Sequence, residues 1–165
     1  MRGVVADTTP LHYLVLIESI DLLPRLFETV HVPAEVRAEL LDAGAPLSVR
    51  EWATAPPSWV MVHTVPDIEV NALPRSLDDG ERAAIALAGM IRPELILIDE
   101  RAGAAVAETW GLAVTGTLGV LTRAADRGMI DLPAAFAALQ ATNFHVRQVL
   151  LDRLLAEDRD KRAGS

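Results

Sequence analysis

Short apolar runs alternate with helical patterns along most of the chain. Four runs have the form of buried strands, at residues 3–6, 29–32, 94–100 and 112–116. Apolar residues spaced three or four apart predict helices over residues 9–19, 21–28, 34–44, 46–55, 78–91, 101–111, 117–128, 132–142 and 146–158. Residues 59–65 are compatible with either an additional strand or an extended connection.

Strands that alternate with helices predict an α/β fold, a three-layer α/β/α sandwich with a mostly parallel central sheet. The chain has 165 residues, of which 51% are hydrophobic, and it shows no internal repeat or linker. We therefore expect a single domain over residues 1–155, large enough to bury a substantial core. The charged residues 156–165 predict a disordered tail.

Composition narrows the possible chemistry. The absence of cysteine excludes disulfides, thiolate nucleophiles and cysteine-based zinc sites. No apolar run approaches the roughly 20 residues that span a bilayer, and no signal-peptide cleavage site follows the first apolar run. We therefore expect a cytoplasmic protein with no membrane partner. The net charge of −8 argues against a broad basic surface for nucleic acid, so an anionic substrate would need metal ions or local arginines.

Four acidic residues occupy unusual positions. Asp7 and Asp99 each follow a predicted strand, and the carboxyl ends of parallel strands share one edge of the sheet. Glu81 heads the apolar stripe of its helix, formed by Ala84, Ile85 and Ala88. Glu39 lies three residues after Val36, also on the apolar side of its helix. Carboxylates in such positions are costly unless they are paired, protonated or bound to metal.

Convergence of Asp7, Glu39, Glu81 and Asp99 would favour Mg²⁺ or Mn²⁺, which prefer oxygen ligands. Such an ion activates water and neutralises phosphoryl oxygens, the chemistry of phosphodiester hydrolysis. Each acid also has a structural interpretation, as a helix cap or a solvated side chain. Candidate accessory residues are Thr8, Glu100 and Thr117, and Asp78 and Asp79 are assigned to helix capping. Candidate phosphate ligands near helix starts are Arg82, Arg101 and Arg123, which solvated helix faces explain equally well.

The segments VVADTTPLHYL, VHVPAEVRAEL, DDGERAAIALA and LILIDERAGAAVAETWGLAVTGTLGVLTRAADRGMI occur in this order between about residues 3 and 150. In these segments the chain resembles the PIN-domain superfamily, the fold of VapC-like toxin ribonucleases, and in particular a PIN-like subgroup. Many members have aspartate where this chain has Glu81, and IDERAG replaces their common Thr-x-Asp segment.

The resemblance implies a metal-dependent endoribonuclease that hydrolyses RNA with Mg²⁺ or Mn²⁺, with Asp7, Glu39, Glu81 and Asp99 as catalytic and metal-binding residues. It also implies a toxin that forms a homodimer and is inhibited by a small antitoxin protein. Two alternatives stay open. One is a catalytically inactive PIN-like module that binds RNA or protein. The other is a receiver-type phosphoacceptor, although the only lysine, Lys161, lies beyond the predicted strands.

Overall fold

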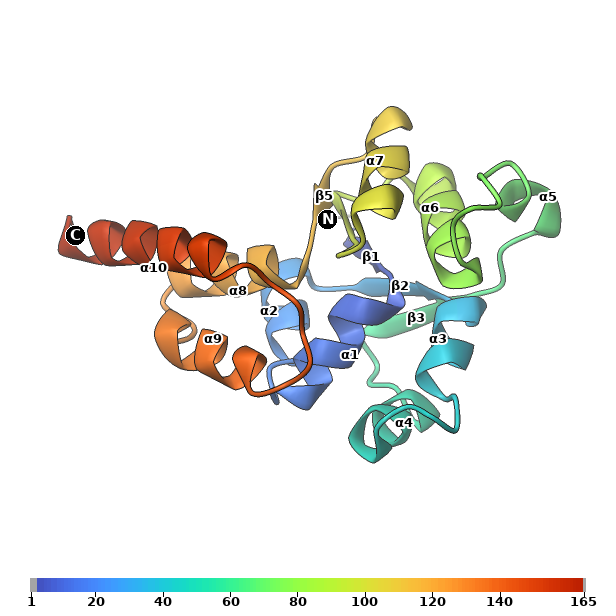
Figure 1. Ribbon diagram of the computed structural model, residues 1–165. Coiled ribbons are helices and arrows are strands. Elements are labelled where there is room, and N and C mark those ends of the chain that lie inside the picture. Colours follow the sequence, from blue (N-terminus) through green and yellow to red (C-terminus); the bar gives the residue numbers. More distant parts are fainter. Residues whose placement is uncertain (1–2, 165) are drawn as a thin grey trace. The chain divides into compact units, whose positions relative to one another are not determined.

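A parallel five-stranded sheet forms the centre of the computed structural model, which describes residues 3–164 (Figure 1). The strands are β1 (Val4–Ala6), β2 (Val30–Pro33), β3 (Val60–His63), β4 (Leu95–Leu97) and β5 (Val114–Thr115). Their order is β3-β2-β1-β4-β5, so β1 lies in the middle and β3 forms one edge. The segment at 59–65 thus contains a strand, and the predicted α/β/α fold class is confirmed.

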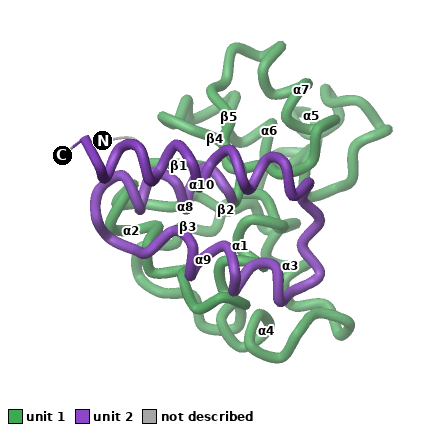
Figure 2. Tube along the Cα trace, turned by 60° about the vertical axis from the view of Figure 1, so that its left-hand side comes forward, with its two compact units in different colours: residues 1–117 green, residues 118–165 purple. Residues whose placement is uncertain are grey.

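The chain divides into two compact units, residues 1–117 and 118–165, coloured separately in Figure 2. The first unit contains the sheet together with helices α1 (Thr8–Leu16), α2 (Leu22–Phe27), α3 (Ala34–Leu40), α4 (Leu47–Thr54), α5 (Asp67–Val70), α6 (Asp79–Ile91) and α7 (Arg101–Thr109). Figure 1 shows α6 and α7 on one side of the strands and α1 and α4 on the other. The prediction of one domain over residues 1–155 stays a prediction.

Helix α6 provides the core on its side of the sheet. Its residues from Ala83 to Ala88 are buried together with Val5 of β1 and Ile96 of β4. The small side chains of α6 allow it to lie close to the strands, which fixes the position of its first turn near the carboxyl ends of β1 and β4. This placement determines where Glu81 lies.

Two elements of the first unit differ from the sequence prediction. Helix α3 ends at Leu40 rather than near Gly44, because the Asp42 carboxylate accepts a hydrogen bond from the backbone N–H of Gly44 at 2.8 Å. Such a local side-chain bond offers the backbone an alternative to the helix. The short helix α5 was not predicted, since four residues are too few to show helical periodicity.

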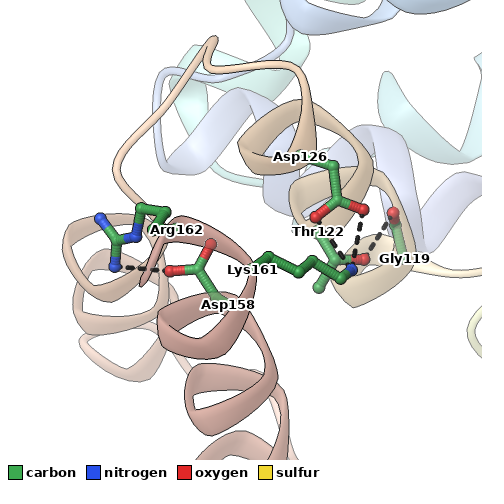
Figure 3. Close-up of polar contacts among 6 residues, drawn as sticks. All are labelled: Gly119, Thr122, Asp126, Asp158, Lys161 and Arg162. Atoms are coloured by element: carbon green, nitrogen blue, oxygen red, sulfur yellow. Dashed lines mark hydrogen bonds and ion pairs between the residues drawn. The ribbon is translucent and has the colours of Figure 1, made fainter. Parts of the chain in front are cut away.

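The second unit consists of helical segments. It contains nearly all of α8 (Thr117–Asp126), followed by α9 (Leu132–Gln140) and α10 (Gln148–Ala163). Near the end of α10, Lys161 Nζ lies 3.0 Å from Asp126 Oδ1, and an Arg162 nitrogen lies 2.6 Å from Asp158 Oδ2 (Figure 3). These ion pairs accompany a helix that continues to Ala163, where the sequence predicted a disordered tail; Ser165 lies outside the described residues.

Within residues 3–164, every helix is too short or too polar to span a lipid bilayer.

Candidate functional site: buried carboxylates at the sheet edge

Asp7 follows β1 directly and is only 3% exposed. Its backbone N–H donates to the carbonyl oxygen of Leu97 at 2.9 Å, which ties the end of β1 to the end of β4. Asp7 is the N-cap residue of α1, yet its side chain makes no capping hydrogen bond. Its Oδ1 is buried without a hydrogen-bond partner, so capping does not explain this carboxylate.

Glu39 connects three helices of the first unit. Its Oε2 accepts a hydrogen bond from the hydroxyl of Thr8 in α1, and its Oε1 accepts one from the backbone N–H of Gly80 in α6 at 3.0 Å. A Cβ atom at Gly80 would lie 2.6 Å from Glu39 Oε1, so a larger residue there would force this carboxylate to move. Glu39 is therefore not a solvated helix residue.

Glu81 both caps its helix and carries a buried free oxygen. Its backbone N–H donates to Asp78 Oδ1 at 2.8 Å, and its Oε1 accepts from the Asp78 backbone N–H at 3.3 Å, which completes a capping box. Its other oxygen, Oε2, is buried without a partner. A Cβ at Gly103 of α7 would lie 2.5 Å from that oxygen. Glu81 thus caps its helix through one carboxylate oxygen and keeps the other buried without a donor.

Asp99 lies just beyond β4 and bonds to the start of α8 rather than to α7. The backbone N–H and the hydroxyl of Thr117 donate to Asp99 Oδ1 and Oδ2, each at 2.7 Å. Gly116 leaves room for this carboxylate, because a Cβ there would lie 2.5 Å from Asp99 Oδ1. Glu100 occupies the N-cap position of α7, which Asp99 was suggested to fill.

Mutual repulsion shows how the acids are grouped. The pKa of Asp7 is raised from 3.8 to about 8. Burial is the main cause, the negative charges of Asp78, Glu81 and Glu39 contribute in addition, and the hydrogen bond from the Thr8 backbone opposes them. Burial is likewise the main cause of the raised pKa of Glu39.

Glu100 joins the two parts of the site. Burial raises the pKa of Glu81 from 4.5 to about 7, with a contribution from the hydrogen-bonded Asp78 and a smaller one from the charge of Glu100. Burial also raises the pKa of Asp99, to which the charge of Glu100 contributes in addition. Glu100 therefore lies within electrostatic reach of both Glu81 and Asp99. Since Ala6 pairs with Leu97, Asp7 and Asp99 extend from neighbouring strands.

The donor chemistry suits a hard divalent cation, but a complete ligand set is not preformed. Two buried oxygens, Asp7 Oδ1 and Glu81 Oε2, have no hydrogen-bond donor, and a cation bound to either oxygen would compensate for its burial. Within residues 3–164, however, no three acidic or histidine side chains form a group that could hold a metal ion as they stand. Both oxygens of Glu39 and of Asp99 already accept hydrogen bonds.

Sequence reasoning did not identify several residues that shape the site. Asp78 was assigned to capping, yet its charge also raises the pKa values of Asp7 and Glu39. Tyr13 lies near the site as well, because burial first and the charges of Asp99 and Glu100 second raise the pKa of its phenol.

A comparison with protein-family models decides the classification. The model described as PIN domain matches residues 3–159, nearly the whole chain. The chain belongs to the PIN-domain family. PIN domains are usually nucleases, so the fold is of a nuclease type. Neither a search of curated proteins nor a search of solved structures found a match.

Proposed function

We propose that this PIN-domain protein is a metal-dependent endoribonuclease that uses Asp7, Glu39, Glu81 and Asp99. The observation that carries the proposal is the pair of buried oxygens without donors, Asp7 Oδ1 and Glu81 Oε2, at the edge of the sheet. A protein rarely buries carboxylates in such surroundings without a compensating ligand or proton.

The four acids would bind Mg²⁺ or Mn²⁺, and the bound ion would supply activated water and neutralise charge on the phosphate. The residues of the chain have separate tasks around that ion. Thr8 and the Gly80 N–H orient Glu39, and Thr117 fixes both oxygens of Asp99. The capping box with Asp78 leaves only Oε2 of Glu81 available to a ligand. Glu100 is proposed as an accessory acid.

Cleavage of RNA by the purified protein in Mn²⁺ tests the proposal. Asp7→Asn keeps the shape of the side chain but removes the negative charge, and we expect at least a 100-fold loss of cleavage rate, a magnitude typical of removing an electrostatic catalytic group. Asp67→Asn is the control, because Asp67 is exposed in α5 and undergoes the same change of charge. Equal cleavage by wild type and Asp7→Asn would point to a contaminating nuclease and contradict the proposal.

The more specific role, that of a toxin inhibited by a small antitoxin, rests on the resemblance to VapC-like proteins. Expression of the wild-type protein in a bacterial host should then arrest growth, and expression of Asp7→Asn should not. Homodimer formation and a cytoplasmic location belong to the same proposal. Light scattering of the purified protein measures the first of these directly.

A second candidate is a PIN-like module that binds RNA or protein without cleaving it. The lack of a preformed three-ligand group among the described residues favours this candidate. Titration with Mn²⁺ separates the two functions, because a ligand that binds only the folded state raises its unfolding temperature. An inactive module should show no stabilisation at millimolar Mn²⁺, whereas the nuclease should be stabilised and Asp7→Asn should not.

A further inference from the structure

Three arginines near helix starts were candidate phosphate ligands, and the structure distinguishes among them. Arg101 is exposed at the first position of α7, and Arg123 belongs to the second unit. Arg82, in the first turn of α6, is partly buried. Of the arginines in the described part of the chain, only Arg82 has a buried side-chain nitrogen, Nε, without a hydrogen-bond partner.

The position of Arg82 on α6 follows from two contacts of that helix. A Cβ at Gly89 would lie 2.9 Å from the ring of Trp110, so this side of α6 faces the end of α7. Arg82 precedes Gly89 by seven residues, about two helical turns, and lies on the same side. Glu81 faces Gly103 near the start of α7. Arg82 therefore lies along the α6–α7 contact, at the end where the acidic site is located.

No anionic side chain among residues 3–164 pairs with the Arg82 guanidinium. Asp78 and Asp79 precede Arg82 by four and three residues, the spacing at which helical ion pairs form. Yet no ion pair or side-chain hydrogen bond of Arg82 occurs within residues 3–164. Asp78 is instead held in the capping box with Glu81. A buried donor without an acceptor costs free energy, which an anionic ligand would recover.

We propose that Arg82 binds a backbone phosphate of the RNA substrate beside the carboxylate site, an inference that rests on the proposed nuclease function. A guanidinium presents a planar set of donors that matches phosphate oxygens. The chain carries a net charge of −8, and several acids surround the site, so a substrate phosphate needs a local positive charge. Arg82 supplies that charge one residue beyond Glu81.

The test measures binding of a fluorescent single-stranded RNA in the Asp7→Asn background, without metal, so that no cleavage interferes. We expect Arg82→Gln to weaken binding about tenfold, in the range of a hydrogen bond to a charged group. The slope of log K against log salt should fall by about 0.7, as for one lost phosphate contact on a single strand. Arg82→Lys should show an intermediate affinity and the original slope. Arg25→Gln, an equal change at an exposed residue of α2, should change neither quantity.

The outcomes separate the inference from the function on which it rests. Unchanged affinity and slope in Arg82→Gln would overturn the inference, while cleavage by the wild-type protein in Mn²⁺ would leave the nuclease proposal intact. A large fall in the unfolding temperature of both Arg82→Gln and Arg82→Lys, without a change in slope, would show a structural role and also overturn it. If RNA binding depends on Arg82 but the wild-type protein does not cleave RNA, only the nuclease proposal is refuted. Absence of both binding and cleavage would refute both.

Discussion

Among single residues, Asp7 shows most clearly how burial changes the protonation of the acids in this fold. The side chain is placed by the end of β1 and buried, and one of its oxygens has no donor. Its pKa is raised to about 8, so near neutral pH the folded protein holds a proton that the unfolded chain releases. Glu81, with a pKa raised to about 7, behaves in the same direction.

These two shifts predict how stability depends on pH in the metal-free protein. Stability from the protonated acids is fully present below their unfolded pKa values near 4, and it is lost progressively as pH rises toward 8. We expect the unfolding temperature to be at least about 5 °C higher at pH 5 than at pH 8. Thermal unfolding followed by circular dichroism measures this difference.

Asp7→Asn provides the control for that dependence, because asparagine does not titrate. The variant should be more stable than the wild type at pH 8 and should show a smaller difference between the two pH values. A wild-type protein whose unfolding temperature is equal or higher at pH 8 would show that the buried acids are not protonated in the fold.

The four candidate acids were selected from the sequence because each occupies a position that its element explains poorly. Strand ends selected Asp7 and Asp99, and helical spacing selected Glu39 and Glu81. The hydrogen-bond partners were less predictable, since they join residues as distant as Thr8 and Glu39, or Gly80 and Glu39. Spacing along one element carries no information about such contacts between elements.

At the scale of elements, glycines allow the helices to approach the carboxylates. Gly80 in α6 lies against Glu39, Gly103 in α7 against Glu81, and Gly116 before α8 against Asp99. In a helix, glycine is normally about 1 kcal/mol less favourable than alanine. Gly80 and Gly103 carry this cost, and each leaves space for a carboxylate of another helix. The sequence alone did not reveal these contacts.

Gly103→Ala tests this role of glycine. The added methyl group would lie 2.5 Å from Glu81 Oε2, so we expect the variant to be destabilised by about 1–3 kcal/mol, as for overpacking, instead of gaining helix stability. Chemical denaturation measures the free energy of unfolding.

Glu81→Asp shortens the acid by one methylene and should relieve the clash. The double variant with Gly103→Ala should therefore recover part of the lost stability, giving a coupling free energy of at least about 0.5 kcal/mol between the two positions. Additive effects would show that Gly103 does not accommodate Glu81.

The elements themselves were predicted better than their ends. Alternation of apolar runs and helical stripes located the five strands, counting the ambiguous segment at 59–65, and all the longer helices. The end of α3 depends on the Asp42 side chain. The extension of α10 to Ala163 accompanies ion pairs between residues that are distant in sequence, such as Lys161 and Asp126. Hydrophobic periodicity does not encode contacts of this kind.

At the scale of the whole molecule, charge is the dominant problem for the proposed substrate. A net charge of −8 repels RNA, and the buried acids add to that repulsion near the site. Two positive charges would oppose this repulsion locally. One is a divalent cation bound among the carboxylates, and the other is the guanidinium of Arg82 beside them. The proposed metal site and the proposed phosphate contact of Arg82 therefore meet the same electrostatic requirement but depend on different residues.

Metal binding by the buried carboxylates is tested most directly by anomalous diffraction, measured near the manganese absorption edge, from crystals grown with Mn²⁺. We expect an anomalous peak within bonding distance, about 2.0–2.3 Å, of oxygens from Asp7 and from Glu81 or Asp99, and no such peak in crystals of Asp7→Asn. A wild-type crystal with no anomalous peak among these carboxylates, from protein that cleaves RNA in the same Mn²⁺ concentration, would show that these acids do not bind the catalytic metal.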